Sequence, residues 1–196
     1  MDAHHIYRPL LDLIGRAEGT DRGRGYDETL AYGLLTGGPV RLTRMSLDEI
    51  DALQTRMLAH PRNRWNSSAV GRYQIVRATL RDLRRRLGLD GKQRFDPALQ
   101  DRLACFLLGR RGIDRCLAGA IGEREFIDAL AREWASLPGS GGRSAYSGQK
   151  AAVSLAEVRR VLAAVRARAG PPAFDWRRIF RWLAALLPVA GIGDRP

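Results

Sequence analysis

The sequence has little cysteine, and this excludes several kinds of site. Only two of its 196 residues are Cys, Cys105 and Cys116, eleven positions apart in a stretch with helical character. They form no CxxC pair, and no His stands at metal-ligand spacing from them, so we predict no metal site. We expect two buried thiols, and a disulfide only if the protein works outside the cytoplasm.

A classical secretion signal is also missing. The first seven residues, MDAHHIY, contain no basic segment followed by an apolar run. We therefore expect synthesis in the cytoplasm without a signal peptide, so that work in the periplasm or cell wall requires release by another route.

Acidic residues are few relative to basic ones: 21 Asp and Glu stand against 33 Lys and Arg, which gives the chain a net charge of +12 and a pI near 11.0. Lys occurs only at Lys92 and Lys150, and a genome that favours Arg codons would explain that bias. The positive field remains, and it indicates an anionic partner: nucleic acid, an acidic membrane surface, or a cell wall that carries carboxylates and phosphates.

The pattern of apolar residues predicts a mainly α-helical protein. Hydrophobic residues make up 45% of the chain, and the length suits one domain with an appendage. Apolar stripes at helical spacing, with capping and stop signals, predict helices that begin near residues 9, 46, 80, 96, 126 and 154. The fourth begins at Asp96-Pro97, and the fifth should end at Pro138-Gly139. Residues 20–40 are predicted to form an irregular loop or a small hairpin, which is the only candidate for β structure.

The best domain boundary is the Gly170-Pro171-Pro172 sequence. It separates a domain over residues 1–169 from a tail over residues 170–196. In the tail, large apolar side chains and arginines fall on opposite sides of a helical wheel, which predicts a cationic amphipathic helix. Residues 174–190 could bind an anionic membrane or lipopolysaccharide, or the helix could dock on the core.

Glu18 is the first candidate catalytic residue. It lies in AEGTD, residues 17–21, where an apolar helix ends against a glycine. Partial burial and the negative end of the helix dipole both raise a carboxyl pKa, so this group could hold a proton near neutral pH and donate it. Taken alone, a Glu before a Gly is also an ordinary solvated helix end.

Two further segments have the composition of a ligand-binding loop. Residues 67–75 combine small residues with Arg72, Tyr73 and Gln74, and residues 133–149 run from a helix end into a Gly/Ser loop that carries Tyr146. Each segment by itself is equally compatible with an ordinary connection.

The three segments together resemble the lambda-phage lysozyme family of endolysins. The resemblance covers residues 6–167 and rests on five motifs in order: AEGTD (17–21), GYD (25–27), GRYQ (71–74), WASLPG (134–139) and a later Tyr with Gly-Gln (146–149). It implies a lysozyme-like fold with a cleft between two lobes and Glu18 as the catalytic residue. It also implies that Tyr26, Arg72, Tyr73, Gln74 and Tyr146 lie in or near the sugar-binding cleft.

Two departures from the family pattern concern the cleft. Residues 42–66 match poorly, so one lobe can differ in shape. The insertion at residues 142–144 leaves the placement of Tyr146 less well determined than that of Glu18.

The resemblance implies cleavage of peptidoglycan glycan strands at the β-1,4 bond between MurNAc and GlcNAc, by a monomer without a cofactor. In this family one Glu acts alone, and the C6 hydroxyl of the sugar closes a 1,6-anhydro ring on MurNAc. Most glycosidases use two carboxylates. Asp27 follows Glu18 by nine residues, a spacing also seen in phage lysozymes in which an Asp positions the hydrolytic water, so hydrolysis by Glu18 and Asp27 stays open.

A basic module that binds nucleic acid or the cell envelope is the alternative of a different class. Against it, the arginines are scattered over many predicted helices, and no zinc-finger, RRM or homeodomain pattern is present. We therefore expect no nucleic-acid partner.

Overall fold

The computed structural model describes residues 5–170, and that part of the chain is mainly helical, as predicted. The predicted tail, including residues 174–190, lies outside the described residues. The α-helices in the described part are α1 (Arg8–Ala17), α2 (Leu47–Ala59), α3 (Arg77–Leu87), α4 (Pro97–Arg110), α5 (Ile113–Leu117), α6 (Glu123–Glu133) and α7 (Leu155–Ala169). Four short 3-10 helices lie between α1 and α2: η1 (Thr20–Arg22), η2 (Gly25–Asp27), η3 (Leu30–Gly33) and η4 (Leu42–Arg44).

The capping signals in the sequence set the starts of three helices. Ser46 and Glu49 form a complete capping box at α2, with bonds of 2.7 and 3.3 Å. Asp96 accepts the Leu99 N–H at 2.8 Å and starts α4 before Pro97. Ser154 caps α7 in the same way.

Of the two alternatives predicted for residues 20–40, the irregular loop is the one observed: the segment forms 3-10 turns, and the described residues contain only isolated β-bridges, one of them between Val70 and Ile75. One prediction of a helix end was wrong. Helix α6 ends at Glu133, before the expected Pro138-Gly139, because Trp134 is extended with φ −121° and ψ 102°.

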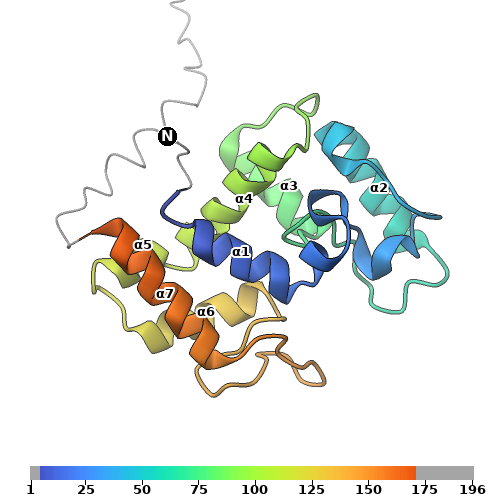
Figure 1. The fold of residues 1–196 in the computed structure, drawn as a ribbon. Coiled ribbons are helices and arrows are strands. Elements are labelled where there is room, and N and C mark those ends of the chain that lie inside the picture. Colours follow the sequence, from blue (N-terminus) through green and yellow to red (C-terminus); the bar gives the residue numbers. More distant parts are fainter. Residues whose placement is uncertain (1–4, 171–196) are drawn as a thin grey trace, which may run out of the picture.

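Figure 1 shows the helices in two groups, consistent with the lysozyme-like arrangement predicted from the sequence. Helices α2 and α3 pack together on one side, and α5, α6 and α7 lie on the other. Helices α1 and α4 lie between the groups and contact each other, and α1 also packs along α7. The end of α1 that carries Glu18 therefore points toward the loops of the first group.

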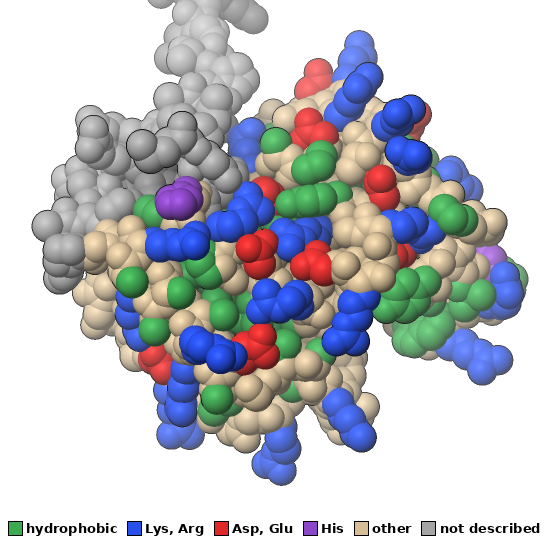
Figure 2. All heavy atoms as spheres, in the orientation of Figure 1, with side chains coloured by type: hydrophobic (Ala, Val, Ile, Leu, Met, Phe, Trp, Pro, Cys, Tyr) green, Lys and Arg blue, Asp and Glu red, His purple; other side chains and the backbone are tan. Residues whose placement is uncertain are grey.

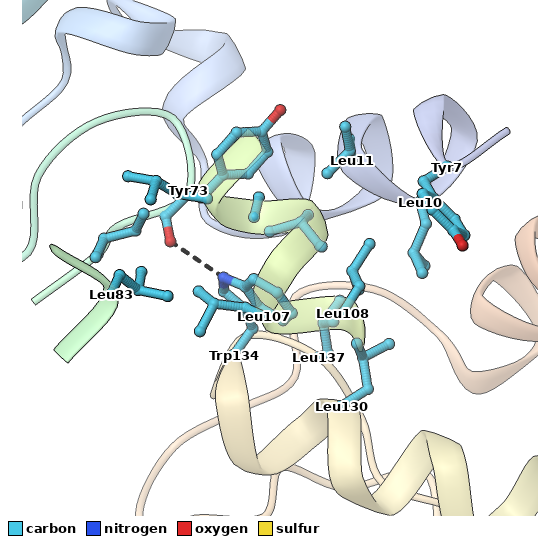
Figure 3. Packing of buried hydrophobic residues seen from close by; sticks show 14 of the residues in the cluster. Tyr7, Leu10, Leu11, Tyr73, Leu83, Leu107, Leu108, Leu130, Trp134 and Leu137 are labelled. Atoms are coloured by element: carbon cyan, nitrogen blue, oxygen red, sulfur yellow. Dashed lines mark hydrogen bonds between the residues drawn. The ribbon is translucent and has the colours of Figure 1, made fainter. Parts of the chain in front are cut away.

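One hydrophobic core runs through both groups. Leu10, Leu11, Leu13 and Ile14 of α1 are completely buried in it, and full burial of such a side chain contributes about 1.5–3 kcal/mol. The Trp134 indole N–H donates a 3.1 Å bond to the carbonyl oxygen of Tyr73 across this core (Figure 3). That bond joins the segment after α6 to the loop before α3.

Candidate active site

Glu18 is the residue that ends α1. Its backbone N–H still donates to the Ile14 carbonyl at 2.8 Å, and the next residue, Gly19, turns the chain with φ 76°. This left-handed conformation is one that glycine adopts readily. The preceding Ala17 is buried, so the core holds the base of Glu18 while its carboxyl group lies at the edge.

The carboxyl group of Glu18 is largely buried and has one hydrogen-bond donor, the Ser136 hydroxyl, at 2.6 Å from Oε1. Burial raises the pKa of Glu18 above its usual value, because the charged form loses hydration, while the Ser136 bond acts in the opposite direction. A carboxyl group with a raised pKa stays protonated closer to neutral pH. This is the property that a general acid requires.

Ser136 reaches Glu18 because the segment after α6 is fixed on both sides. The Leu137 N–H donates to the Trp134 carbonyl at 2.9 Å, and the Ser136 carbonyl accepts the Ala152 N–H at 2.7 Å. Ser136 lies within the predicted loop segment, but its sequence context gave no sign that it would contact Glu18.

The GRYQ segment forms a tight turn against the loop that follows Glu18. Val70 and Ile75 pair through both backbone bonds, at 3.2 and 3.0 Å. The Thr20 hydroxyl lies 2.8 Å from the Arg72 carbonyl and 3.1 Å from the Gly15 carbonyl. The turn is thereby tied to the end of α1. Gly71 has φ 76°, and a β-carbon there would stand 2.3 Å from the Gln100 amide oxygen, so only glycine fits.

Arg72 and Tyr73 are in the predicted region, but their side chains face the protein. Tyr73 is 1% exposed, its hydroxyl donates to Asp101, and burial raises its pKa well above the usual value. The Arg72 guanidinium binds Asp21 at 2.8 Å and Asp12 at 3.0 Å. It also lies over the Tyr26 and Tyr73 rings.

The buried Tyr73 ring offers no surface to a ligand in this structure, so a substrate-binding role for Tyr73 stays a prediction. We assign Arg72 and Tyr73 to the support of the site. Arg72 joins the turn to α1 through Asp12, and Tyr73 joins it to α4 through Asp101. Arg8 of α1 also binds the Asp101 carboxylate, at 2.6 Å.

Asp27 and Tyr26 line an open pocket. A pocket of about 700 Å³ opens on η1 and η2. Its lining consists of Asp21, Gly23, Arg24, Gly25, Tyr26, Asp27, Thr43, Arg72 and Pro97, without Glu18. Asp27 is half-buried there, and its Oδ1 accepts the Thr43 N–H at 2.7 Å. The Tyr26 hydroxyl donates to Asp101 at 2.8 Å.

The side chains of Gln74 and Tyr146 each donate a hydrogen bond to a backbone carbonyl of the protein. The Gln74 amide donates to the Gly71 carbonyl at 2.9 Å, and its backbone is left-handed with φ 48°. Tyr146 is 46% exposed, and its hydroxyl donates to the Arg132 carbonyl at 2.8 Å. Ser144 bonds to the Ala135 carbonyl, so the Tyr146 loop stays close to Ser136 and, through it, to Glu18.

No group of three or more His, Cys, Asp or Glu side chains within residues 5–170 is arranged to hold a metal ion. Cys105 and Cys116 form no disulfide bond in the structure. Cys116 is buried, as predicted, and burial raises its pKa, whereas Cys105 is only half-buried. Within the same part of the chain, none of the helices has the length and apolar character needed to cross a membrane.

Comparison with known proteins identifies the family of this chain. The family model described as Endolysin matches residues 8–169. The Endolysin of Escherichia phage lambda is 33% identical over 138 residues, which cover 68% of this chain and 78% of that protein. No solved structure matches significantly. Because the family match spans the whole helical region and includes the Glu18 and Ser136 segments, the chain belongs to the endolysin family of peptidoglycan-degrading lysis enzymes.

Proposed function

We propose that this protein cleaves the β-1,4 bond between MurNAc and GlcNAc in peptidoglycan, with Glu18 as the acid and then the base. The observation that carries the proposal is the buried Glu18 carboxyl at the end of α1, held by the Ser136 hydroxyl. The endolysin family match supplies the substrate class. We expect a monomer that acts on glycan strands in the periplasm or cell wall.

We propose the lytic transglycosylase route. Protonated Glu18 gives its proton to the glycosidic oxygen as the bond to C1 of MurNAc breaks. The resulting carboxylate takes the proton of the C6 hydroxyl as that oxygen bonds to C1, which closes the 1,6-anhydro ring. Glu18 ends protonated as it began, and no water is consumed. One carboxyl group is sufficient for both steps.

The place of Asp27 supports this route over hydrolysis. Its Oδ1 accepts the Thr43 N–H at 2.7 Å, so one oxygen of the carboxylate is already engaged in holding η4. In two-carboxylate glycosidases the second carboxylate must act directly at the scissile bond. Hydrolysis by Glu18 and Asp27 remains the second candidate, because the Asp27 pocket is open and large enough to hold water.

Mass analysis of the digestion products tests the proposal. Purified peptidoglycan digested by the protein should release fragments that end in 1,6-anhydroMurNAc, each lighter by one water than a reducing end. Reducing ends throughout would replace the transglycosylase route with hydrolysis, and intact strands would remove the proposed activity altogether.

The matched control is Glu18→Gln, which keeps the shape of the side chain but cannot exchange the proton. Loss of general acid–base catalysis should lower the rate roughly 10²–10⁴-fold. If the variant has the circular dichroism of the wild type and still clears walls at more than about a tenth of its rate, Glu18 is not the acid.

The tail proposal has its own test. Because residues 174–190 lie outside the described part of the chain, only their sequence supports contact with anionic lipid or lipopolysaccharide. A chain that ends at Gly170 should keep its activity on purified peptidoglycan and lose binding to anionic vesicles. Destabilisation of the shortened protein, with no vesicle binding by the intact one, would place the tail on the core instead.

A further inference from the structure

Tyr32 is the most exposed of the large hydrophobic side chains in the described part of the chain, at 66%. It belongs to η3, and none of the sequence motifs includes it. A β-carbon built on Gly19 would stand 3.2 Å from the Tyr32 hydroxyl oxygen, and one built on Gly23 would stand 3.4 Å from the ring atom Cε1. The ring therefore lies over the turn that directly follows Glu18.

The backbone that carries this ring is strained. Ala31 has φ 54° and ψ 36°, and Tyr32 has φ 55° and ψ 37°, so two consecutive non-glycine residues are left-handed. Their backbone groups are bonded within the turn, Tyr32 to Thr29 at 3.0 Å and Leu34 to Ala31 at 3.1 Å. Glycine would adopt the same turn with little cost.

Burial does not compensate for this strain, because most of the Tyr32 ring is in solvent. Backbone strain of this kind is concentrated at functional sites, where the surrounding structure holds it in place. The bonded turn holds a large, exposed side chain in this conformation next to the residue that follows Glu18, which makes Tyr32 a candidate for contact with a ligand.

Other exposed aromatic side chains lie on loops connected to the same region. Trp65 is 53% exposed, and its loop is joined to the residue after η3 by a 3.5 Å bond from Arg62 to the Leu34 carbonyl. Figure 2 shows hydrophobic side chains on the surface at the side where the loops around α2 lie in Figure 1. Tyr146 lies on the loop that Ser136 joins to Glu18. Two groups of exposed aromatic side chains are therefore connected to Glu18: Tyr32, with the Trp65 loop joined to η3, and Tyr146 on the loop held near Ser136.

We propose that the Tyr32 ring stacks on a pyranose ring of the glycan strand and so positions the strand for Glu18. A pyranose presents a face of C–H groups with slight positive charge, which suits the electron-rich face of an aromatic ring. The glycan strand consists of pyranose rings. One of these sugar rings must lie beside Glu18 for its glycosidic bond to be cut, and the Tyr32 ring is next to that place. This inference rests on the proposed function and assigns Tyr32 as a positioning residue.

Because the backbone at Tyr32 is strained, substitutions there should affect stability and glycan binding in opposite directions, which separates the two effects. Tyr32→Gly removes the ring and relieves the backbone, so it should raise the midpoint of thermal unfolding while weakening glycan binding. Ala31→Gly is the matched control: it relieves the same type of strain, keeps the ring, and should leave binding and activity unchanged. Tyr32→Asn is a second ring-less variant, because Asn tolerates left-handed backbone better than most residues. Tyr32→Phe keeps the stacking face and should bind like the wild type.

Binding is measured by sedimentation with purified peptidoglycan, with Glu18→Gln added to each variant so that the polymer is not cut. We expect Tyr32→Gly and Tyr32→Asn to bind about 2–12-fold more weakly, the range for one aromatic contact. In the catalytically intact proteins the loss should raise KM more than it lowers kcat.

Wall clearance by the wild type separates the two proposals. If the wild type clears walls and the Tyr32 variants bind as it does, the stacking role is wrong and the proposed function stands. The role is equally wrong if Ala31→Gly lowers binding as much as Tyr32→Gly, since the loop rather than the ring would then matter. If the wild type neither binds nor cuts peptidoglycan, the proposed function fails first.

Discussion

The hydroxyl of Ser136 donates a 2.6 Å hydrogen bond to the carboxyl group of Glu18, although the two residues are 118 positions apart. This contact joins the end of the first helix to the segment after α6. It also tunes the acid, because the bond favours the ionised carboxylate and opposes the effect of burial on the pKa of Glu18.

The first prediction is that Ser136→Ala moves the pH dependence of activity. Without the hydroxyl, the pKa of Glu18 should rise further, so the alkaline limb of the kcat/KM profile should move to higher pH. Activity at the optimum should fall, since the carboxyl group is less well oriented. A turbidity assay over a pH series measures both effects.

Two controls accompany this variant. Ser136→Thr retains a hydroxyl and should restore the wild-type profile. Ser140→Ala removes another hydroxyl of the same loop, one that donates to Asp128 at 2.9 Å. This variant should leave the pH dependence of kcat/KM unchanged. An unshifted alkaline limb in Ser136→Ala would show that the bond does not tune Glu18.

The second prediction concerns stability. Burial raises the pKa of Glu18 in the folded protein above its ordinary value of 4.5, so the folded state favours the protonated form. This contribution is fully present below pH 4.5 and is lost as the pH rises through the folded-state pKa. Glu18→Gln removes the ionisation, so it should be more stable than the wild type at neutral pH and gain little at pH 4.

Thermal unfolding of both proteins between pH 4 and pH 8 checks this dependence. The difference between their midpoints should grow with pH. A difference that is constant, or that is largest at pH 4, would contradict a raised pKa for Glu18.

The sequence predicted the helices well because their signals are local. Capping at Ser46, Asp96 and Ser154 and the stop at Gly88 depend on residues within one turn of the helix end. Residues 20–40 were predicted less well. Their glycines indicate turns, but what holds those turns is distant contact, such as the bond from Thr43 to Asp27.

The site was predicted in part for the same reason. The position of Glu18 at a helix end can be read from the apolar stripe that precedes it. The contact with Ser136 and the burial of Tyr73 depend on how distant elements pack, and short motifs do not contain that information. Tyr32 had no sequence signal, because a strained backbone angle is visible only in the structure.

The third prediction separates support from sugar binding at Tyr73. Tyr73→Phe removes a buried hydroxyl that donates to Asp101, and the carboxylate loses one of its donors. The free energy of unfolding should fall by about 1–3 kcal/mol. Activity per folded molecule at low temperature should change little. Tyr146→Phe, at an exposed position, is the matched control and should alter stability by less than about 0.5 kcal/mol.

Denaturant unfolding and wall clearance give the two readouts. If Tyr73→Phe kept its full stability but lost activity, Tyr73 would belong to the substrate site after all.

The last prediction concerns Asp27 and decides the chemistry. Asp27→Asn keeps an oxygen that can accept the Thr43 N–H but removes the negative charge, so the loop should stay folded. If Glu18 works alone, this variant should retain most of the wall-clearing activity and still produce anhydro ends. A hydrolase that needs Asp27 to position water should lose most of its activity, and its remaining products should carry reducing ends.

Asp27→Ala provides the comparison for the loop. It removes both the charge and the acceptor for Thr43, so any activity lost in Asp27→Ala but not in Asp27→Asn reports the structural bond. Activity lost equally in both variants reports the charge. That result would make Asp27 the second catalytic carboxylate, because removal of the charge is the change that the two substitutions share.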